Sequence, residues 1–428
     1  MLDFLSNRAT AAHLALAAIA PLVLCKYFLP GAVFIALLWL ALIAAVWSYM
    51  APSKGDCDYT AEARYRFLGN AVRDPALWAA VLFVVYCAVT ELNSGVSFGY
   101  DPELKTWSLL PPPAPLLPGS VRGGAGIPFA GSLLALAVYP AVAHSLDFRQ
   151  SVYAVNFAST IVMLDAVFSY AAGFGIPFGA SVAYGLWALA AAAAMFSAER
   201  SRQRPKELLS ALALAGCLSA LLFAGRPAVA CVFVAAVLLV AVLFPAFMFR
   251  ELGFVGIVRG LLLVLVAAGI AAVLFQCLSG EWEALIPVWS TDSDPILKRF
   301  ALEAWETSPW IGHGAGSFPL VSKLAATAED WATLGPIPDF YCNGWRALLA
   351  ERGIVGLAVI AGVLGSMSFV WFRHAFQRGF EHFAAAVLLF PVALAAVSVA
   401  MVFDSSALRV EAIVAFAAVA AFSVNGGQ

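Results

Sequence analysis

Residues 227–248 read PAVACVFVAAVLLVAVLFPAFM, a run of 22 positions without a charged side chain. A helix needs about 20 apolar residues to cross the hydrocarbon core of a bilayer, so this run predicts a transmembrane helix. Comparable windows recur, and we expect twelve such helices, at 10–25, 31–49, 76–92, 127–144, 151–172, 177–197, 207–224, 227–248, 256–277, 354–372, 383–402 and 406–424. The first resembles a signal peptide but lacks a small-residue cleavage site, so we expect an uncleaved span.

The composition of the chain excludes several classes of protein. Of its 428 residues, 63% are hydrophobic and 12% are charged, whereas soluble domains are about 25% charged. The balance of 24 Lys and Arg against 26 Asp and Glu gives no basic surface for nucleic acid. The seven cysteines show neither a disulfide framework nor a metal-ligand spacing, and we expect no metal or cofactor. We therefore expect an all-α, polytopic membrane protein with a single integral domain over residues 1–428.

The distribution of basic residues predicts how the chain is oriented. Basic residues stay on the cytoplasmic side of a membrane. With the N-terminus inside, the inner loops hold Lys54, Arg64, Arg66, Arg73, Arg149, Arg200, Arg202, Arg204, Lys206, Arg250, Arg259, Arg373 and Arg378. The short outer connections hold only Lys26, Arg226 and Arg409. We therefore expect both termini to be cytoplasmic and two longer segments, 93–126 and 278–353, to face outward.

The two outward segments differ in character. Segment 93–126 is rich in Pro and Gly, which predicts a structural connector without regular structure. Segment 278–353 is the larger of the two and holds six of the twelve tryptophans. Pro295 follows Ser293 and Asp294, which are good helix caps, and apolar residues then recur at helical spacing as far as Ser308 and Pro309. This pattern predicts an amphipathic helix that lies on the membrane surface or dips into it.

A cluster of glycines, GHGAGSF at 312–318, follows that helix. Such spacing also occurs in phosphate-binding loops, but here no buried strand precedes it and no Lys-Ser/Thr pair follows it. We therefore predict a tight turn, in which glycine takes conformations that other residues avoid.

Three arginines are candidate anion-binding residues. Arg226 lies in a Gly-Arg-Pro break between two spans, where a basic side chain is costly without a partner. The guanidinium fork of arginine suits phosphate oxygens, and Arg299 and Arg409 offer the same chemistry. Each also has a purely structural interpretation. Arg226 can snorkel to lipid headgroups, Arg299 can pair with Glu303 at i,i+4, and Arg409 can pair with Asp404 or Glu411.

Several motifs together resemble those of one bacterial family. They are RFALEAW (299–305), SPWIGHGAGSF (308–318), LAERGIVG (349–356), GRPA (225–228) and FDSSALR (403–409). In this order, around a large outer loop between the ninth and tenth spans, they resemble the O-antigen ligase and O-antigen polymerase superfamily. The resemblance covers about residues 220–424.

The resemblance implies a GT-C-like membrane fold in the bacterial inner membrane, with a catalytic loop at 278–353 in the periplasm. It implies a metal-independent, inverting glycosyltransferase. The donor would be a glycan on a polyprenyl diphosphate, and the acceptor a sugar hydroxyl on lipid A core or on another glycan. Arg226 and Arg299, with Arg409 as a further candidate, would bind the diphosphate and stabilise the leaving group.

One position departs from the family pattern. The family has a histidine, proposed as a general base, nine residues before the Glu of its LAE motif, and Cys342 occupies that position here. His313 is the only histidine that we expect to face outward, and Asp339 lies three residues before Cys342. Either residue can replace the base. Alternatively, transfer depends on donor positioning and leaving-group stabilisation, or this chain has lost activity or changed its acceptor.

Other functions remain open from the sequence. A polysaccharide polymerase would share the fold and differ only in its acceptor. A transporter is disfavoured, because transporters place ionisable groups near the bilayer midplane and the spans here are nearly free of charge. A non-catalytic scaffold of an envelope-assembly complex fits the missing histidine.

Overall fold

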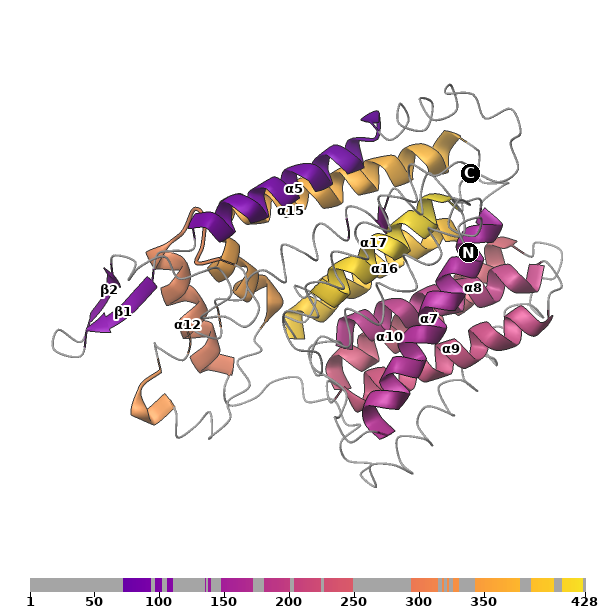
Figure 1. Cartoon of the computed structure of the whole chain (residues 1–428), viewed down its shortest axis with the longest axis horizontal. Helices are drawn as coiled ribbons and strands as arrows, with labels where there is room; N and C mark the ends of the chain where they lie inside the picture. Colours follow the sequence, from indigo (N-terminus) through magenta and orange to yellow (C-terminus); the bar gives the residue numbers. More distant parts are fainter. Residues whose placement is uncertain are drawn as a thin grey trace, which may run out of the picture.

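The computed structural model of the chain describes residues 72–93, 97–101, 106–110, 135, 138–139, 148–171, 181–200, 204–224, 227–248, 294–314, 318, 322, 326–330, 343–377, 386–403 and 410–425. Within these residues the ordered elements are helices and one two-stranded hairpin (Figure 1). In chain order they are α5 (Pro75–Asn93), β1 (Ser97–Asp101), β2 (Thr106–Leu110), α7 (Phe148–Ala171), α8 (Ser181–Arg200), α9 (Arg204–Phe223), α10 (Pro227–Met248), α12 (Asp294–Thr307), α15 (Gly344–Gln377), α16 (Ala386–Phe403) and α17 (Val410–Asn425).

The helical character predicted from the apolar windows is confirmed wherever those windows are described. The windows from 76–92 onward fall on α5, α7, α8, α9, α10, α15, α16 and α17. The windows 10–25, 31–49 and 256–277, and most of 127–144, lie outside the described residues. By length and composition, two described stretches are long and apolar enough to cross a membrane, Ser151–Phe168 in α7 and Gly344–Arg373 in α15. The described apolar stretches of the other helices are shorter.

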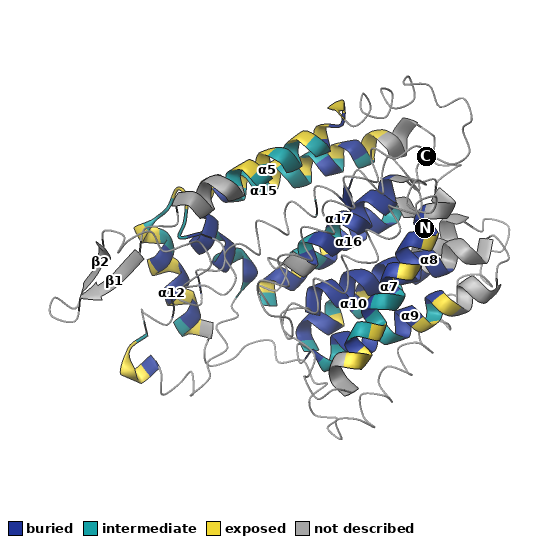
Figure 2. Ribbon diagram, viewed as in Figure 1, coloured by how far each residue is buried: buried dark blue, intermediate teal, exposed yellow. Residues whose placement is uncertain are grey.

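Helix α8 lies at the centre of the main helical bundle. It contacts α7, α9, α10, α16 and α17, and its alanines Ala188 and Ala190–Ala194 are fully buried (Figure 2). Small side chains at helix interfaces let helix backbones approach closely. The alanine-rich sequence therefore explains why α8, rather than a helix of larger residues, is enclosed by its neighbours.

Gly185 in α8 provides a test of this packing. A Cβ atom at Gly185 would lie 2.3–2.6 Å from ring atoms of Phe233, which is fully buried in α10. We expect Gly185→Ala to lower the free energy of unfolding by about 1–3 kcal/mol, as overpacking usually does, despite the better helix propensity of alanine. Thermal unfolding in detergent measures the effect. Gly362→Ala is the matched control, since nothing lies within 4 Å of that Cβ position. Equal stability of the two variants would contradict the packing argument.

A second, smaller core lies at one end of the paired helices α5 and α15 (Figure 1). Its buried apolar residues come from α12, from Phe318 and from the first turns of α15, and are Leu297, Phe300, Ala301, Ala304, Phe318, Ala347 and Ala350. Helix α15 changes direction at Gly353, where the backbone is non-helical (φ 62°, ψ −168°). The kink separates the part of α15 that belongs to the small core from the long apolar part.

This core corrects the environment predicted for the amphipathic helix. The bounds of α12 agree with the sequence prediction, but its apolar face packs on Phe318, Ala347 and Ala350 rather than on a membrane surface. Helical periodicity shows only that one face needs an apolar partner. Here the partner comes from elsewhere in the same chain.

The prediction that segment 93–126 lacks regular structure is wrong for its first part. β1 and β2 pair in antiparallel register, with Phe98 opposite Leu109 and Tyr100 opposite Trp107. In both strands, aromatic or apolar residues alternate with small or polar residues, and this alternation favours β structure. The prolines that motivated the prediction follow β2 and lie outside the described residues.

Candidate functional site

The candidate site is built on α12 and on the turn that follows it. Helix α12 begins at Asp294 with Pro295 in its first turn, where proline costs no hydrogen bond. It ends at Thr307, whose hydroxyl donates to the carbonyl of Ala304 at 2.7 Å. Two residues further on, Pro309 prevents continuation of the helix. The chain then enters the glycine-rich turn, 308–314.

The predicted turn is observed, and its backbone docks onto the kink of α15. Gly312 (φ 73°) and Gly314 (φ 96°) take left-handed conformations that favour glycine. A Cβ atom at Gly312 would lie 2.4 Å from backbone atoms of Glu351 and Arg352. The absence of a side chain at this position therefore permits contact between two backbones.

Four hydrogen bonds join the turn to the kink. In a straight helix, Ile354 N–H and Val355 N–H would donate to the carbonyls of Ala350 and Glu351. Here they donate instead to Pro309 O (2.9 Å) and Trp310 O (3.0 Å). The two carbonyls released in α15 accept from His313 N–H (3.1 Å) and Gly314 N–H (2.8 Å). The turn thus supplies partners for these four backbone groups, which the kink deprives of their helical partners, as buried backbone requires.

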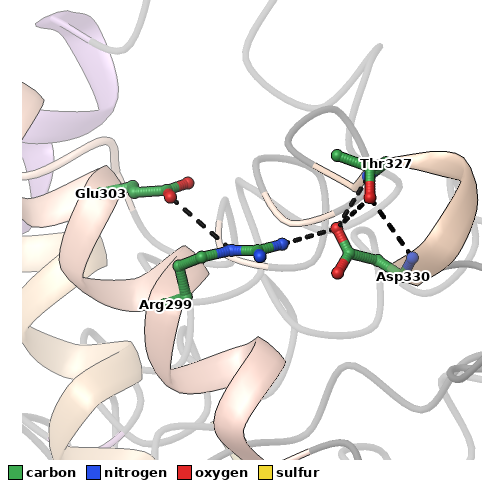
Figure 3. Close-up of polar contacts among 4 residues, drawn as sticks. All are labelled: Arg299, Glu303, Thr327 and Asp330. Atoms are coloured by element: carbon green, nitrogen blue, oxygen red, sulfur yellow. Dashed lines mark hydrogen bonds and ion pairs between the residues drawn. The ribbon is translucent and has the colours of Figure 1, made fainter.

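Arg299 lies on the exposed side of α12, where two carboxylates contact its side chain (Figure 3). Its Nη2 donates to Asp330 Oδ2 at 2.5 Å, and its Nε lies 3.7 Å from Glu303 Oε1. The pair with Glu303 was predicted from the i,i+4 spacing, whereas the pair with Asp330 was not. The Arg299 side chain is 48% exposed and that of Asp330 only 7%. Arg299 is therefore ion-paired but still accessible.

Asp330 is a fixed anion. Its Oδ2 accepts hydrogen bonds from the backbone N–H and the hydroxyl of Thr327, both at 2.8 Å. Burial opposes ionisation of this carboxyl, but the hydrogen bonds from Thr327 and Arg299 outweigh it and hold its pKa below the usual range. Asp330 is therefore ionised at neutral pH and orients the Arg299 guanidinium.

A shallow groove runs along this exposed side of α12. Its described lining residues are Pro295, Lys298, Arg299, Leu302, Glu303 and Glu306. Among the described residues, no hydrogen bond or ion pair occupies Arg299 Nη1. Lys298 lines the groove as well, but Glu303 and Glu306 offset its positive charge, so an anion would be bound through Arg299 Nη1 alone. This arrangement can accept an anionic oxygen on a cation whose orientation is already set.

His313 caps the end of α12. Its Nε2 lies 2.6 Å from Ala304 O and 3.0 Å from Thr307 Oγ1. A carbonyl oxygen only accepts hydrogen bonds, so Nε2 carries a proton and donates it. Burial lowers the pKa of His313, and the hydrogen bond to Ala304 offsets part of that effect. In this geometry His313, one of the two candidates for the base, would have to accept a substrate proton on Nδ1 rather than on Nε2.

The lowered pKa of His313 predicts that acid weakens the turn. Because the folded pKa lies below the ordinary value of about 6.5, the unfolded chain binds the proton more readily. The stabilisation is complete above about pH 6.5 and is lost as the pH falls from there through the folded pKa. We expect faster amide hydrogen exchange at Gly312–Gly314 at pH 5.5 than at pH 7.5, after correction for intrinsic rates. His313→Gln keeps a neutral donor and should remove this difference, and an equal acid response in both proteins would refute the assignment.

The other predicted site residues, Arg226, Arg409 and Asp339, lie outside the described residues, as does Cys342 at the position of the family histidine. The binding of one diphosphate by Arg226 and Arg409 together with Arg299 stays a prediction. Glu351, by contrast, was not predicted as a site residue although it belongs to the LAE motif, and it is buried. One of its oxygens accepts from the N–H of Phe318 at 3.1 Å, which ties Phe318 to α15.

Asp330 was also missed. The spacing Thr327-x-x-Asp330 is the pattern of a capping box, and the Asp330 N–H donates back to Thr327 Oγ1 at 3.3 Å. That signal predicts a helix start but not a partner for Arg299.

No group of three or more His, Cys, Asp or Glu side chains that could hold a metal ion occurs in the part of the chain that the structure describes. No protein-family model matches the chain, and no curated protein matches it either.

Proposed function

We propose that this protein transfers a glycan from a polyprenyl diphosphate to a sugar hydroxyl on the periplasmic face of a bacterial inner membrane, as an O-antigen ligase does. The proposal includes about twelve transmembrane helices in a GT-C-like arrangement, with both termini cytoplasmic. One observation gives this proposal its main support. Arg299, which the motif resemblance assigns to diphosphate binding, is half exposed, oriented by Asp330 and Glu303, and followed along the chain by a turn joined to the long apolar helix α15.

The proposed reaction needs a cation at the leaving group. The acceptor hydroxyl oxygen attacks the anomeric carbon from the side opposite the diphosphate. The bond from that carbon to the diphosphate oxygen breaks with inversion, and the polyprenyl diphosphate leaves with the electron pair. Arg299, together with Arg226 and Arg409, would stabilise the charge that develops on this leaving group.

The hydroxyl proton passes to a base or to water. His313 Nε2 already donates to Ala304 O, and Cys342 replaces the family histidine. Asp339, and His313 acting through Nδ1, are both candidates for the base in this proposal. Leaving-group stabilisation would account for most of the rate enhancement if no side chain serves as the base.

Two other functions are alternatives to that of a ligase. A polymerase would use the same donor site with another growing chain as acceptor. A non-catalytic assembly scaffold is favoured by one observation, Cys342 at the position of the family base.

Gel analysis of lipopolysaccharide and secreted polysaccharide from a deletion strain tests these functions. Loss of polymer from lipid A core, with lipid-linked polymer accumulating, is expected for a ligase. Single repeat units in place of polymer indicate a polymerase. Unchanged glycan transfer by an Arg226→Ala, Arg299→Ala double variant would point to a scaffold and contradict both enzymatic functions.

A further inference from the structure

The kink of α15 coincides with a change in the charge pattern of that helix. Arg346, Glu351 and Arg352 precede or adjoin Gly353, and no charged residue then occurs from 354 to 372. The next charge is Arg373. The apolar part of α15 therefore has a charged residue close to each of its ends.

The length of this uncharged part matches the thickness of a bilayer core. Nineteen helical residues, 354–372, span about 28 Å at about 1.5 Å per residue, close to the roughly 30 Å of hydrocarbon. The complete stretch Gly344–Arg373 has 30 residues, or about 45 Å. If only the uncharged part crosses the core, one hydrocarbon boundary falls at Gly353.

The glycine-rich turn presents apolar side chains at that level. Trp310 is 67% exposed and Ile311 is 42% exposed. The carbonyl of Trp310 accepts from Val355 N–H, so the Trp310 backbone is fixed to the first residues after the kink. Ile354 and Val355 are themselves 42% and 40% exposed. These four residues form an exposed apolar patch that continues onto the apolar part of α15.

We propose that Trp310 and Ile311 insert into the headgroup region of the bilayer at the Gly353 end of α15. Indole combines a large apolar ring with a polar N–H, and tryptophan is enriched at this depth of membranes for that reason. The patch is continuous with a helix long and apolar enough to cross the membrane, which favours lipid over a protein partner as its occupant. The four backbone hydrogen bonds at the kink fix the depth of the turn.

This inference does not depend on glycan transfer, but it bears on the position of Arg299. Helix α12 leads directly into the turn, and His313 ties the turn back to Ala304. A turn anchored in the headgroup layer would therefore hold α12 at a fixed height above the membrane, whatever ligand Arg299 binds.

The depth of Trp310 can be measured directly. The full-length protein is labelled with 5-fluorotryptophan and reconstituted in nanodiscs of phosphatidylcholine and phosphatidylglycerol. Trp310→Phe and, independently, Trp310→Tyr assign its fluorine resonance by loss of one signal. We expect a headgroup spin-labelled lipid to remove most of the intensity of this signal, and a water-soluble gadolinium chelate to have a much smaller effect.

Trp305 provides the internal comparison. Its ring nitrogen is buried and the residue is less exposed than Trp310, so its signal, assigned with Trp305→Phe, should be less affected by the spin-labelled lipid than that of Trp310. Broadening of the Trp310 signal by the chelate alone would place the turn in water. Protection from both agents would place it against protein. Either result overturns the proposal.

Discussion

Gly353→Val is expected to destabilise the protein strongly, and more than Gly185→Ala does. The backbone conformation at Gly353 (φ 62°, ψ −168°) lies in a region that is essentially restricted to glycine. A Cβ atom there would lie 2.5 Å from the carbonyl carbon and oxygen of Trp310. Relieving that overlap separates the turn from the kink and breaks the four hydrogen bonds between them. We expect a loss of about 3 kcal/mol or more, from backbone strain and unsatisfied buried groups.

Thermal unfolding in detergent and hydrogen exchange of the 309–314 amides measure this loss. Gly365→Val is the matched control, because it makes the same change in the same helix where nothing lies within 4 Å of the Cβ position. We expect exchange in the turn to increase strongly for Gly353→Val and to stay unchanged for Gly365→Val. Protection of the turn in both variants would show that the docking of the turn does not depend on the kink.

Arg299→Ala is expected to lower glycan transfer by about 10²–10³-fold, the effect usual for removal of one group that stabilises leaving-group charge. Arg299→Lys should restore little of the activity. It keeps the charge but loses the planar fork that Asp330 and Glu303 orient. Transfer by purified protein from a lipid-linked glycan is the measurement. Lys298→Ala is the control, because Lys298 lines the same groove and should contribute little.

A structural explanation of the same loss must be separated from the chemical one. Arg299→Ala leaves the Asp330 carboxylate buried without its cation, which can destabilise the loop. Adding Asp330→Asn removes that charge. Recovery of activity in the double variant would mean that Arg299 serves only the fold. Continued inactivity with restored thermal stability is the result that we expect.

Much of the fold follows from local sequence. The apolar windows predict α7, α9 and α10 as helices because a long uninterrupted apolar run favours a helix over a strand. Pro295 and Pro309 bracket α12, since proline is tolerated in the first turn of a helix but not in its interior. The glycine-rich turn is likewise predictable from glycine spacing.

What the sequence misses depends on contacts between distant residues. Periodicity identified the apolar face of α12 but not its partners, Phe318 and Ala350. The span predicted to start at 354 marks where charge ends, whereas α15 already begins at Gly344 and continues through a kink. Hydropathy locates the residue at which the apolar run begins. Helix α15 continues across that point through the kink at Gly353, and the docked turn supplies the hydrogen bonds that the kink requires.

The candidate site likewise contains one contact that local sequence predicts and others that depend on distant residues. Arg299 and its pairing with Glu303 were predictable because four residues separate them on one helix. Asp330, the shorter contact, lies 31 residues away and carries no local signal of that pairing. His313 was selected because it was expected to face outward, but its donation to Ala304 O depends on how the turn folds back on α12.

Binding of a polyprenyl diphosphate to the purified protein tests the central claim most directly. Titration with undecaprenyl diphosphate, and with the monophosphate as a comparison, needs no knowledge of the glycan or the acceptor. We predict tighter binding of the diphosphate, weakened about 10–100-fold by Arg299→Ala, as expected for loss of a charge-assisted hydrogen bond, and little changed by Lys298→Ala. Equal binding of the diphosphate by wild-type protein and Arg299→Ala would contradict the assignment of Arg299 as a diphosphate ligand.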